Sequence, residues 1–309
     1  MTTEEIVELF KAKPYYREMG KGKLSRRFHC TPEDIIKAKY LAYKHRNKKS
    51  EIKKLPRILI LDIETAPLKA YIFKLWKENI GLDQIVSDWF CICWSAKWLY
   101  SNTIISDRLT PEEILKEDDK RIMVSLSSLL NECDIVITHN GEKFDLPKIN
   151  ARLLLNELPP VKPYQSIDTL KIAKTRFGFS SNKLDWLATM LHIPNKIDTT
   201  FELWKGCMEG NIEALEEMER YNRYDVELLE EVYVKLRPWI VNHPNMGLYF
   251  ESEEKVCPNC GSTHLTPKGF YYTMLNKYEV FQCECGAFSR VRKPTDFNGK
   301  KNILNNNLR

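Results

Sequence analysis

The chain has 309 residues and a formal net charge of +5 at pH 7, with 43% hydrophobic and 29% charged residues. This length exceeds that of a usual single domain, so we expect two or three domains. No apolar run is long enough to span a membrane, and the first residues lack the basic and apolar regions of a signal peptide. We therefore expect a cytoplasmic protein without a membrane partner.

The charge is unevenly distributed along the chain. Residues 1–54 carry a balance of +8, residues 55–254 a balance of −9, and residues 255–309 a balance of +6. Basic arms attract phosphate, and bound cations offset an acidic centre, so the distribution fits an enzyme that acts on nucleic acid.

The N-terminal segment, residues 1–50, is expected to be helical. Residues 24–30 predict a short helix and a turn, and Thr31, Pro32 and Asp34 have the residue types of a helix start. Two helices joined in this way resemble a helix-turn-helix that contacts DNA. A small protein-docking module is the alternative. Residues 44–55 read as a charged linker.

The apolar run Ile58–Ile63 predicts a buried parallel strand that contains Asp62 and is followed by Glu64. A spacing of two places both carboxylates on one face of the strand. Like charges at the end of an apolar strand repel each other and lose hydration, and a divalent cation would offset this cost. A strand end that emerges into solvent is the simpler alternative.

The following segments predict an α/β pattern with two more carboxylates. We expect strands at 89–98, 102–106 and 134–138 and a helix around 112–130. Asp145 lies near the start of a helix over 144–155, where the helix dipole favours an anion. In the long helical pattern from Ile212 towards Leu236, Tyr221 and Asp225 lie one turn apart on one face.

Taken in order, three sets of residues resemble the three motifs of the DEDDy subgroup of 3′–5′ exonucleases. The sets are Asp62-Ile-Glu64, Asn140 with Phe144-Asp145, and Tyr221 with Asp225. Weaker similarity lies at 66–76, 89–98, 167–170 and 181–187, partly to stand-alone exonucleases of bacteriophages and some bacteria. The resemblance implies an RNase H-like domain over 55–245, with a mixed sheet flanked by helices. For a phage-encoded protein the location would be the host cytoplasm.

The resemblance also implies the chemistry. Asp62, Glu64, Asp145 and Asp225 would bind two Mg²⁺ or Mn²⁺ ions, which suit phosphodiester hydrolysis. Tyr221 would orient the attacking water. Asn140 and Phe144 would shape the site near the terminal base, and Lys183 would contact a phosphate. The substrate would be nucleic acid, expected to be DNA with a free 3′ end. A polymerase or another replication protein would be the partner in proofreading.

A second metal site is predicted near the C-terminus. Cys257, Cys260, Cys283 and Cys285 form two pairs with the pattern of a zinc ribbon over residues 250–294, which would bind one structural Zn²⁺. Only one residue separates the second pair, so His264 is an alternative fourth ligand. Between the pairs we expect strand, turn and strand, and residues 295–309 read as a flexible tail.

Two other functions remain open on the sequence. One is an RNA-processing or structure-selective endonuclease on the same fold, because the carboxylates alone do not determine the polarity or the sugar. The other is a DNA-binding accessory protein with an inactive nuclease centre. The presence of all four carboxylates and of Tyr221 argues against inactivity.

Overall fold

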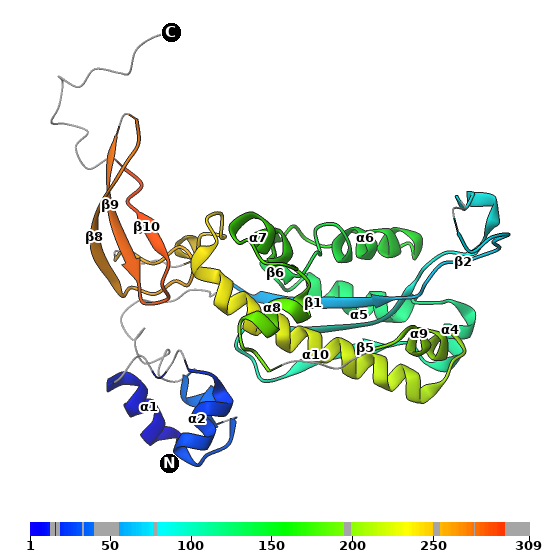
Figure 1. Ribbon diagram of the computed structural model, residues 1–309, viewed down its shortest axis with the longest axis horizontal. Coiled ribbons are helices and arrows are strands. Elements are labelled where there is room, and N and C mark those ends of the chain that lie inside the picture. The colour runs from blue at the N-terminus through cyan, green and yellow to red at the C-terminus, as the bar shows by residue number, and fades with distance from the viewer. Residues whose placement is uncertain are drawn as a thin grey trace, which may run out of the picture.

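The computed structural model describes residues 1–12, 16, 19–32, 34–39, 56–76, 79–194, 199–249, 254–274 and 276–293. Within these residues, five strands form a central sheet in the order β5-β4-β1-β6-β7 (Figure 1). The strands are β1 (Ile58–Thr65), β4 (Cys91–Trp98), β5 (Ile104–Arg108), β6 (Ile135–Thr138) and β7 (Gln165–Asp168). β1 pairs antiparallel with β4 and parallel with β6, so the sheet is mixed.

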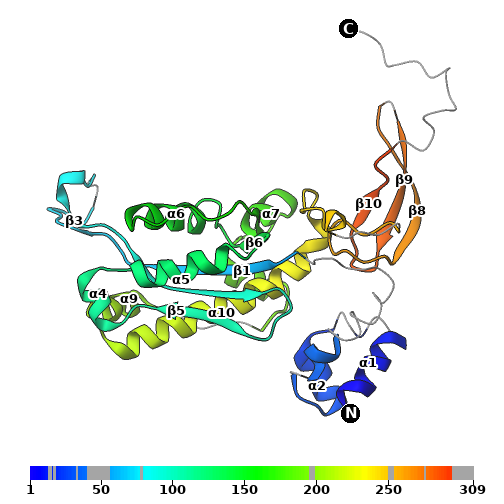
Figure 2. The same cartoon turned by 180° about the vertical axis from the view of Figure 1, so that it is seen from behind.

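The central strand β1 is covered on both faces. Leu59 and Leu61 belong to a core that includes residues of α5 (Lys120–Leu130) and α6 (Asp145–Leu155). Ile58 and Ile60 belong to a second core with α10 (Ile212–Leu236). Figure 2 shows α5 and α10 on opposite sides of the sheet. This alternation explains why β1 is buried and reads as a continuous apolar run.

The remaining helices of the central domain pack around this sheet. They are α4 (Pro111–Lys116), α7 (Thr169–Arg176), α8 (Leu184–Met190) and α9 (Phe201–Met208), with 3-10 turns η3 (Arg237–Trp239) and η4 (Met246–Leu248). The single helix expected around 112–130 is wrong, because the segment divides into α4 and α5. Glu117 takes a left-handed conformation, which ends α4. The buried Asp119 carboxylate then accepts hydrogen bonds from the side chains of Arg152 and Asn156, just before α5 begins.

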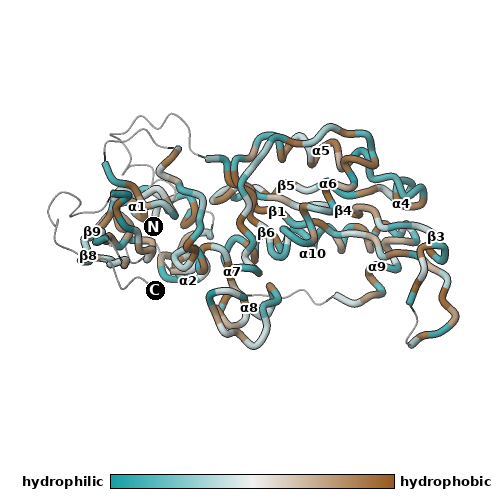
Figure 3. The backbone as a smooth tube through the Cα atoms, turned by 90° about the horizontal axis from the view of Figure 1, so that it is seen from above, coloured by the Kyte–Doolittle hydropathy of each residue, from teal (hydrophilic) through white to brown (hydrophobic). Residues whose placement is uncertain are grey.

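An arm projects beyond the end of β1. β2 (Lys69–Ala70) pairs with β3 (Ile85–Ser87), and η2 (Leu82–Gln84) precedes β3. Its exposed side chains include Phe73, Leu75, Trp76 and Leu82, each more than 80% accessible. Hydrophobic segments are visible along this arm at one end of the molecule (Figure 3).

The described N-terminal residues contain α1 (Thr3–Ala12), which lies in the segment expected to be helical although its bounds were not predicted, and α2 (Lys21–Phe28). Residues 34–39 are also helical. The predicted helix start is confirmed, because the Asp34 amide donates to the Thr31 hydroxyl and the Asp34 carboxylate accepts from the Thr31 amide. The helix-turn-helix itself remains a prediction, since its second helix is described only as far as residue 39. The predicted linker at 44–55 lies outside the described residues.

The C-terminal described residues form the sheet β10-β9-β8, from β8 (Leu265–Tyr272), β9 (Lys277–Cys283) and β10 (Phe288–Arg290). The predicted strand, turn and strand are present as β8 and β9, whereas β10 was not predicted. Asn259 donates to the main-chain oxygens of Arg237 and Ile240, which anchors this sheet beyond the C-terminal end of α10 (Figure 1). No described helix is long and apolar enough to cross a membrane.

Candidate metal centres

The first centre forms where β1 and α10 meet. Ile58 and Ile60 pack against Val226 and Leu229 of α10. Side chains on a strand alternate, so Asp62 and Glu64 continue the same face beyond this core. Earlier positions on α10 then lie opposite them, and these include Tyr221 and Asp225.

The carboxylates predicted from sequence converge there. Carboxylate oxygens of Asp62, Glu64 and Asp225 lie within 4.8 Å of one another. The Tyr221 hydroxyl lies close enough to Asp225 to lower the pKa of that carboxyl group, against the larger effect of burial. Three acidic groups at this separation, with hard oxygen donors, suit a divalent cation such as Mg²⁺ or Mn²⁺.

Asp145 reaches the same place from another direction, at the start of α6. β6 pairs with β1 only as far as Ile60, so the Ile63 N–H extends beyond β6. The Asp145 Oδ1 atom accepts a hydrogen bond from this N–H at 3.2 Å, and Asp145 is only 2% exposed. Asp145 therefore lies beside the other three residues, although its carboxylate oxygens are not within 4.8 Å of all three of their carboxylates.

The electrostatics of the four carboxyl groups fit a cation site. Burial is the main cause that raises the pKa of all four carboxyl groups. The pKa of Glu64 rises to about 8, of Asp145 to about 7 and of Asp225 to about 6, and the pKa of Asp62 lies well above its usual range. Repulsion among Asp62, Glu64, Asp145 and Asp225 adds to the shift for Asp62 and Glu64. Burial and the nearby carboxylates likewise raise the pKa of Tyr221 far above its usual value.

The loop that positions Asp145 is fastened by Asp168. Its carboxylate accepts hydrogen bonds from the main-chain N–H groups of Asn140, Glu142, Leu170 and Lys171. Asn140 has a positive φ of 71°, which suits asparagine at the turn. A Cβ atom at Gly141 would lie 2.2 Å from the Thr138 hydroxyl, so only glycine fits there.

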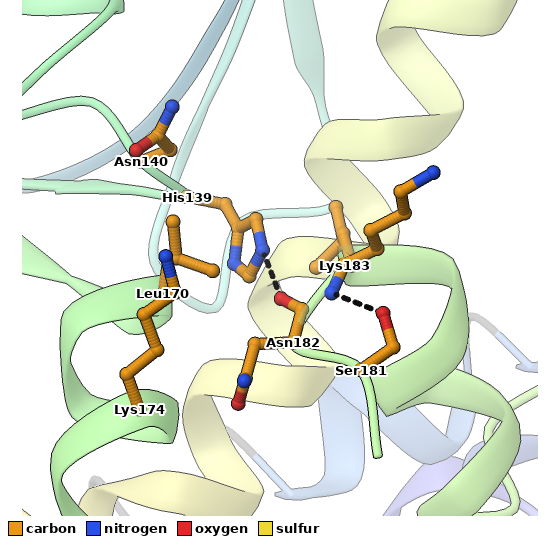
Figure 4. A pocket seen from close by; sticks show the side chains of 8 residues that line it. His139, Asn140, Leu170, Lys174, Ser181, Asn182 and Lys183 are labelled. Carbon is orange, nitrogen blue, oxygen red and sulfur yellow. Dashed lines mark hydrogen bonds between the residues drawn. The ribbon is translucent and has the colours of Figure 1, made fainter. Parts of the chain in front are cut away.

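A cavity of about 410 Å³ lies beside this loop. Its lining includes Asn140, Lys174 and Lys183, from the β6–α6 loop, α7 and the residue before α8 (Figure 4). His139 points to the main-chain oxygen of Asn182, with Nε2 at 2.9 Å, and burial lowers the pKa of its ring. Two of the three predicted nucleic-acid contacts, Asn140 and Lys183, therefore share one polar cavity.

The third predicted contact, Phe144, is exposed and lies next to a lysine. The Lys148 Nζ atom lies 4.9 Å from the centroid of the Phe144 ring and 3.7 Å from that of Trp89. It also donates to the Thr65 hydroxyl at 3.3 Å. Thr65 directly follows Glu64, so this cationic and aromatic cluster flanks the carboxylates.

Sequence reasoning missed two residues that support the centre. Asn222 is fully buried and donates to the Asp62 carboxylate, and Asp168 fastens the loop. The signal for Asn222 was its place between Tyr221 and Asp225. The signal for Asp168 was an acidic residue at the end of a strand, where it accepts from the first N–H groups of α7.

The second centre comprises the four predicted cysteines. The sulfur atoms of Cys257, Cys260, Cys283 and Cys285 all lie within 4.8 Å of one another. The Cys257–Cys285 and Cys260–Cys283 sulfur distances are 3.8 and 3.5 Å. Tetrahedral Zn²⁺ with Zn–S bonds of about 2.3 Å requires sulfur separations of about 3.8 Å, so the donor set fits zinc. His264 does not belong to this group among the described residues.

Known proteins are similar to parts of this chain, mainly in its central domain. A family model of the RNase H superfamily matches residues 100–237. A stretch of 161 residues is 23% identical to a DNA polymerase III of PolC type from Ureaplasma parvum serovar 3, and it spans 50% of this chain but 11% of that protein. The family B DNA polymerase of Pyrobaculum calidifontis matches with a TM-score of 0.40 at 14% identity, over 59% of this chain and 26% of that one.

The family match contains Asp145, Tyr221 and Asp225 and begins after β1. β1 joins the matched segment through its pairing with β6, and it contributes Asp62 and Glu64 to the same centre. Together with the mixed five-stranded sheet flanked by helices, these findings show an RNase H-like fold in the central part of the chain, in which residues 100–237 match the RNase H superfamily.

Proposed function

We propose that this protein is a metal-dependent 3′–5′ exonuclease, which hydrolyses phosphodiester bonds of DNA and releases nucleoside 5′-monophosphates. The observation that carries the proposal is the convergence of the Asp62, Glu64 and Asp225 carboxylates within 4.8 Å, next to Asp145 and Tyr221. Such a cluster is costly to bury without cations, and it therefore needs a functional explanation.

The four carboxylates would hold two Mg²⁺ or Mn²⁺ ions. When bound, such a pair relieves charge at the phosphate and supplies a hydroxide nucleophile. The residues of the chain do the remaining work. Asp62 and Glu64 come from a rigid central strand, whereas Asp225 and Tyr221 come from the middle of a long helix. These rigid elements fix the separation of the ligands, which favours a defined site geometry.

Tyr221 would orient the attacking water. Tyr221 lies one helical turn from Asp225, and its hydroxyl interacts with that carboxylate. A hydroxyl fixed in this way can donate to or accept from a water beside the carboxylates. Asp225 thereby positions Tyr221 as well as serving as a ligand.

The cavity beside the β6–α6 loop would receive the end of the strand. Asn140 and Lys183 line it together with Lys174. A lysine ammonium provides a point charge for a phosphate, and the amide of Asn140 offers both a donor and an acceptor. Phe144, with 38% of its surface exposed, offers a ring for the terminal base.

The choice of DNA is supported by the similarity to a DNA polymerase III, which covers half of this chain. The polarity of attack is supported by the order of the three motifs and their resemblance to DEDDy exonucleases. The basic N-terminal and C-terminal regions favour a polyanionic substrate. For proofreading, a polymerase would be the partner.

The test is digestion of a 5′-labelled single-stranded DNA in Mg²⁺ or Mn²⁺. We expect a ladder that shortens from the 3′ end and that disappears in EDTA and with Asp62→Ala. Glu112→Ala, which changes an exposed acidic residue on α4, should keep the ladder. Cleavage of circular or 3′-blocked DNA would instead favour an endonuclease, and equal or faster digestion of RNA would overturn the choice of DNA. Binding without cleavage would favour an accessory protein.

A further inference from the structure

One face of the C-terminal sheet combines aromatic and basic side chains. Residues paired across antiparallel strands point to the same face. Tyr271 pairs with Tyr278, Val280 pairs with Arg290, and Gln282 pairs with Phe288. Because Tyr278, Val280 and Gln282 alternate along β9, all six side chains share one face. We call these six residues the aromatic-basic face.

This face is not needed to build the core of the small domain. Among the described residues of that domain, the buried cluster consists of Cys257, Cys283 and Ala287. Tyr271 is 53% exposed and Phe288 62% exposed. Large rings left in water on a small domain indicate a surface for a partner.

The charge on this face selects the class of partner. Its strands carry no acidic side chain here among the described residues, whereas Glu279 lies on the opposite face, where it pairs with Lys255. The Arg290 guanidinium lies 4.0 Å from the centroid of Tyr278 and 6.0 Å from that of Tyr271. Residues 265–293 hold five lysines and arginines against two glutamates. The partner should therefore be anionic and should contain planar groups.

We propose that the aromatic-basic face binds single-stranded nucleic acid, with bases stacked on Tyr271 and Phe288 and a phosphate contacted by Arg290. Exposed rings with a neighbouring guanidinium are the physical basis of sequence-tolerant binding of single strands. In a duplex, the base faces are already stacked and cannot cover these rings. This proposal depends on the proposed function in one respect, namely that the bound strand is also the substrate of the exonuclease.

The anchoring of the sheet gives the face a fixed position relative to the carboxylates. Asn259 bonds the main-chain oxygens of Arg237 and Ile240, and Gly286 lies against Pro238. Asp225 and Arg237 are separated along α10 and its extension by about 18 Å, at 1.5 Å per residue. A strand of many nucleotides can span this interval, whereas a mononucleotide ester cannot.

The test measures the binding of full-length protein to a labelled 20-nucleotide thymidine oligomer by fluorescence anisotropy without added Mg²⁺ or Mn²⁺ and without a chelator, so that the C-terminal domain keeps its zinc. The same phosphate backbone without bases is the comparison ligand. The expected result is tighter binding of the thymidine oligomer. Tyr271→Ala should weaken its binding about 5- to 100-fold and remove most of the preference for bases. Tyr271→Phe should restore the affinity, because it keeps the ring.

Tyr272→Ala is the matched control, since Tyr272 lies on the opposite face next to Lys277. It should leave the affinity near that of the wild type. Zinc content and melting temperature establish that each variant is folded. The proposal is overturned if folded Tyr271→Ala binds like the wild type, if Tyr272→Ala loses as much, if the backbone without bases binds equally well, or if duplex is preferred.

Hydrolysis of the nitrophenyl ester of thymidine 5′-monophosphate separates this proposal from the proposed function. This small substrate does not reach the aromatic-basic face, so Tyr271→Ala should hydrolyse it at the wild-type rate. If wild-type protein binds the thymidine oligomer as described but hydrolyses neither the ester nor DNA, the exonuclease proposal fails and the binding face stands.

Discussion

Asn222 donates a hydrogen bond from Nδ2 to Oδ2 of Asp62 at 2.6 Å. Asn222 is fully buried in the middle of α10, and its Oδ1 atom has no partner among the described residues. The bond fixes the rotation of the Asp62 carboxylate from the helix side. Asp62 would therefore present its other oxygen to a bound cation in one defined direction.

Asn222→Ala should lower the affinity for cations in a protein that still folds. Loss of the bond frees the Asp62 carboxylate to rotate, and the loss of such outer-sphere partners typically costs about 10- to 100-fold in metal affinity. The measurement is Mn²⁺ affinity by calorimetry, together with the Mn²⁺ concentration that gives half-maximal cleavage. Glu213→Ala, an exposed position on the same helix, is the control. Unchanged Mn²⁺ affinity in folded Asn222→Ala would show that this bond does not prepare the site.

The cation-free protein should lose stability as the pH rises from about 5 to 8. Folding raises the pKa of Asp225 to about 6, of Asp145 to about 7 and of Glu64 to about 8, against about 4 for unfolded carboxyl groups. The folded state then binds more protons than the unfolded state, so the free energy of unfolding falls as these groups ionise. Urea denaturation in EDTA at several pH values measures this slope.

Two comparisons identify the source of that slope. Asp225→Asn removes one of the repelling charges and should flatten it. Mn²⁺ should stabilise the wild type more at pH 8 than at pH 5.5, because the ion binds deprotonated carboxylates. A free energy of unfolding that rises through this range in EDTA would contradict the assignment.

Asp168→Ala should destabilise the protein by about 2 to 4 kcal/mol, because the substitution leaves main-chain N–H groups without their acceptor. Four such groups, on Asn140, Glu142, Leu170 and Lys171, bond to this carboxylate. Chemical denaturation gives the loss. Asp168→Asn keeps one acceptor oxygen and should lose less. Equal losses in the two variants would argue that charge, and not the number of bonds, fastens the loop.

Purified protein should contain about one zinc per chain, bound at the four cysteines. Cys260→Ser should abolish this content and expose the C-terminal domain to protease, because so small a core needs the metal. Cys30→Ser is the control, since that thiol lies in the N-terminal segment, far in the sequence from the four cysteines. Metal analysis and limited proteolysis provide the measurement. Retention of zinc by Cys260→Ser would favour another ligand set.

Elements with an unambiguous period were predictable from sequence. The apolar run starting at Ile58 became β1, and the long helical pattern became α10 with both ends as expected. Periods of two and 3.6 paired Asp62 with Glu64 and Tyr221 with Asp225, whereas the resemblance to the exonuclease motifs predicted that the two pairs meet. The cysteine cluster followed from spacing alone, even with the short gap between Cys283 and Cys285.

Features that depend on tertiary contacts were not predictable. The left-handed turn at Glu117 interrupts a pattern that otherwise reads as a helix. The burial of Asn222 depends on the rotation of α10 about its axis, which the sequence defines only to within a residue. Asp168 has the composition of an ordinary helix cap, and its bond to the Asn140 N–H is formed across 28 residues. A single sequence contains no local signal for such bonds.

The unbroken course of α10 from Ile212 to Leu236 has a consequence for the products. Tyr221 and Asp225 lie in its middle, and the C-terminal sheet is anchored just beyond its end. If both proposals hold, the helix would set a fixed distance between the place of cleavage and the place where the strand is bound. As a DNA strand shortens, it should lose that binding at one characteristic length. Digestion would then pause there and leave short oligomers of a defined size.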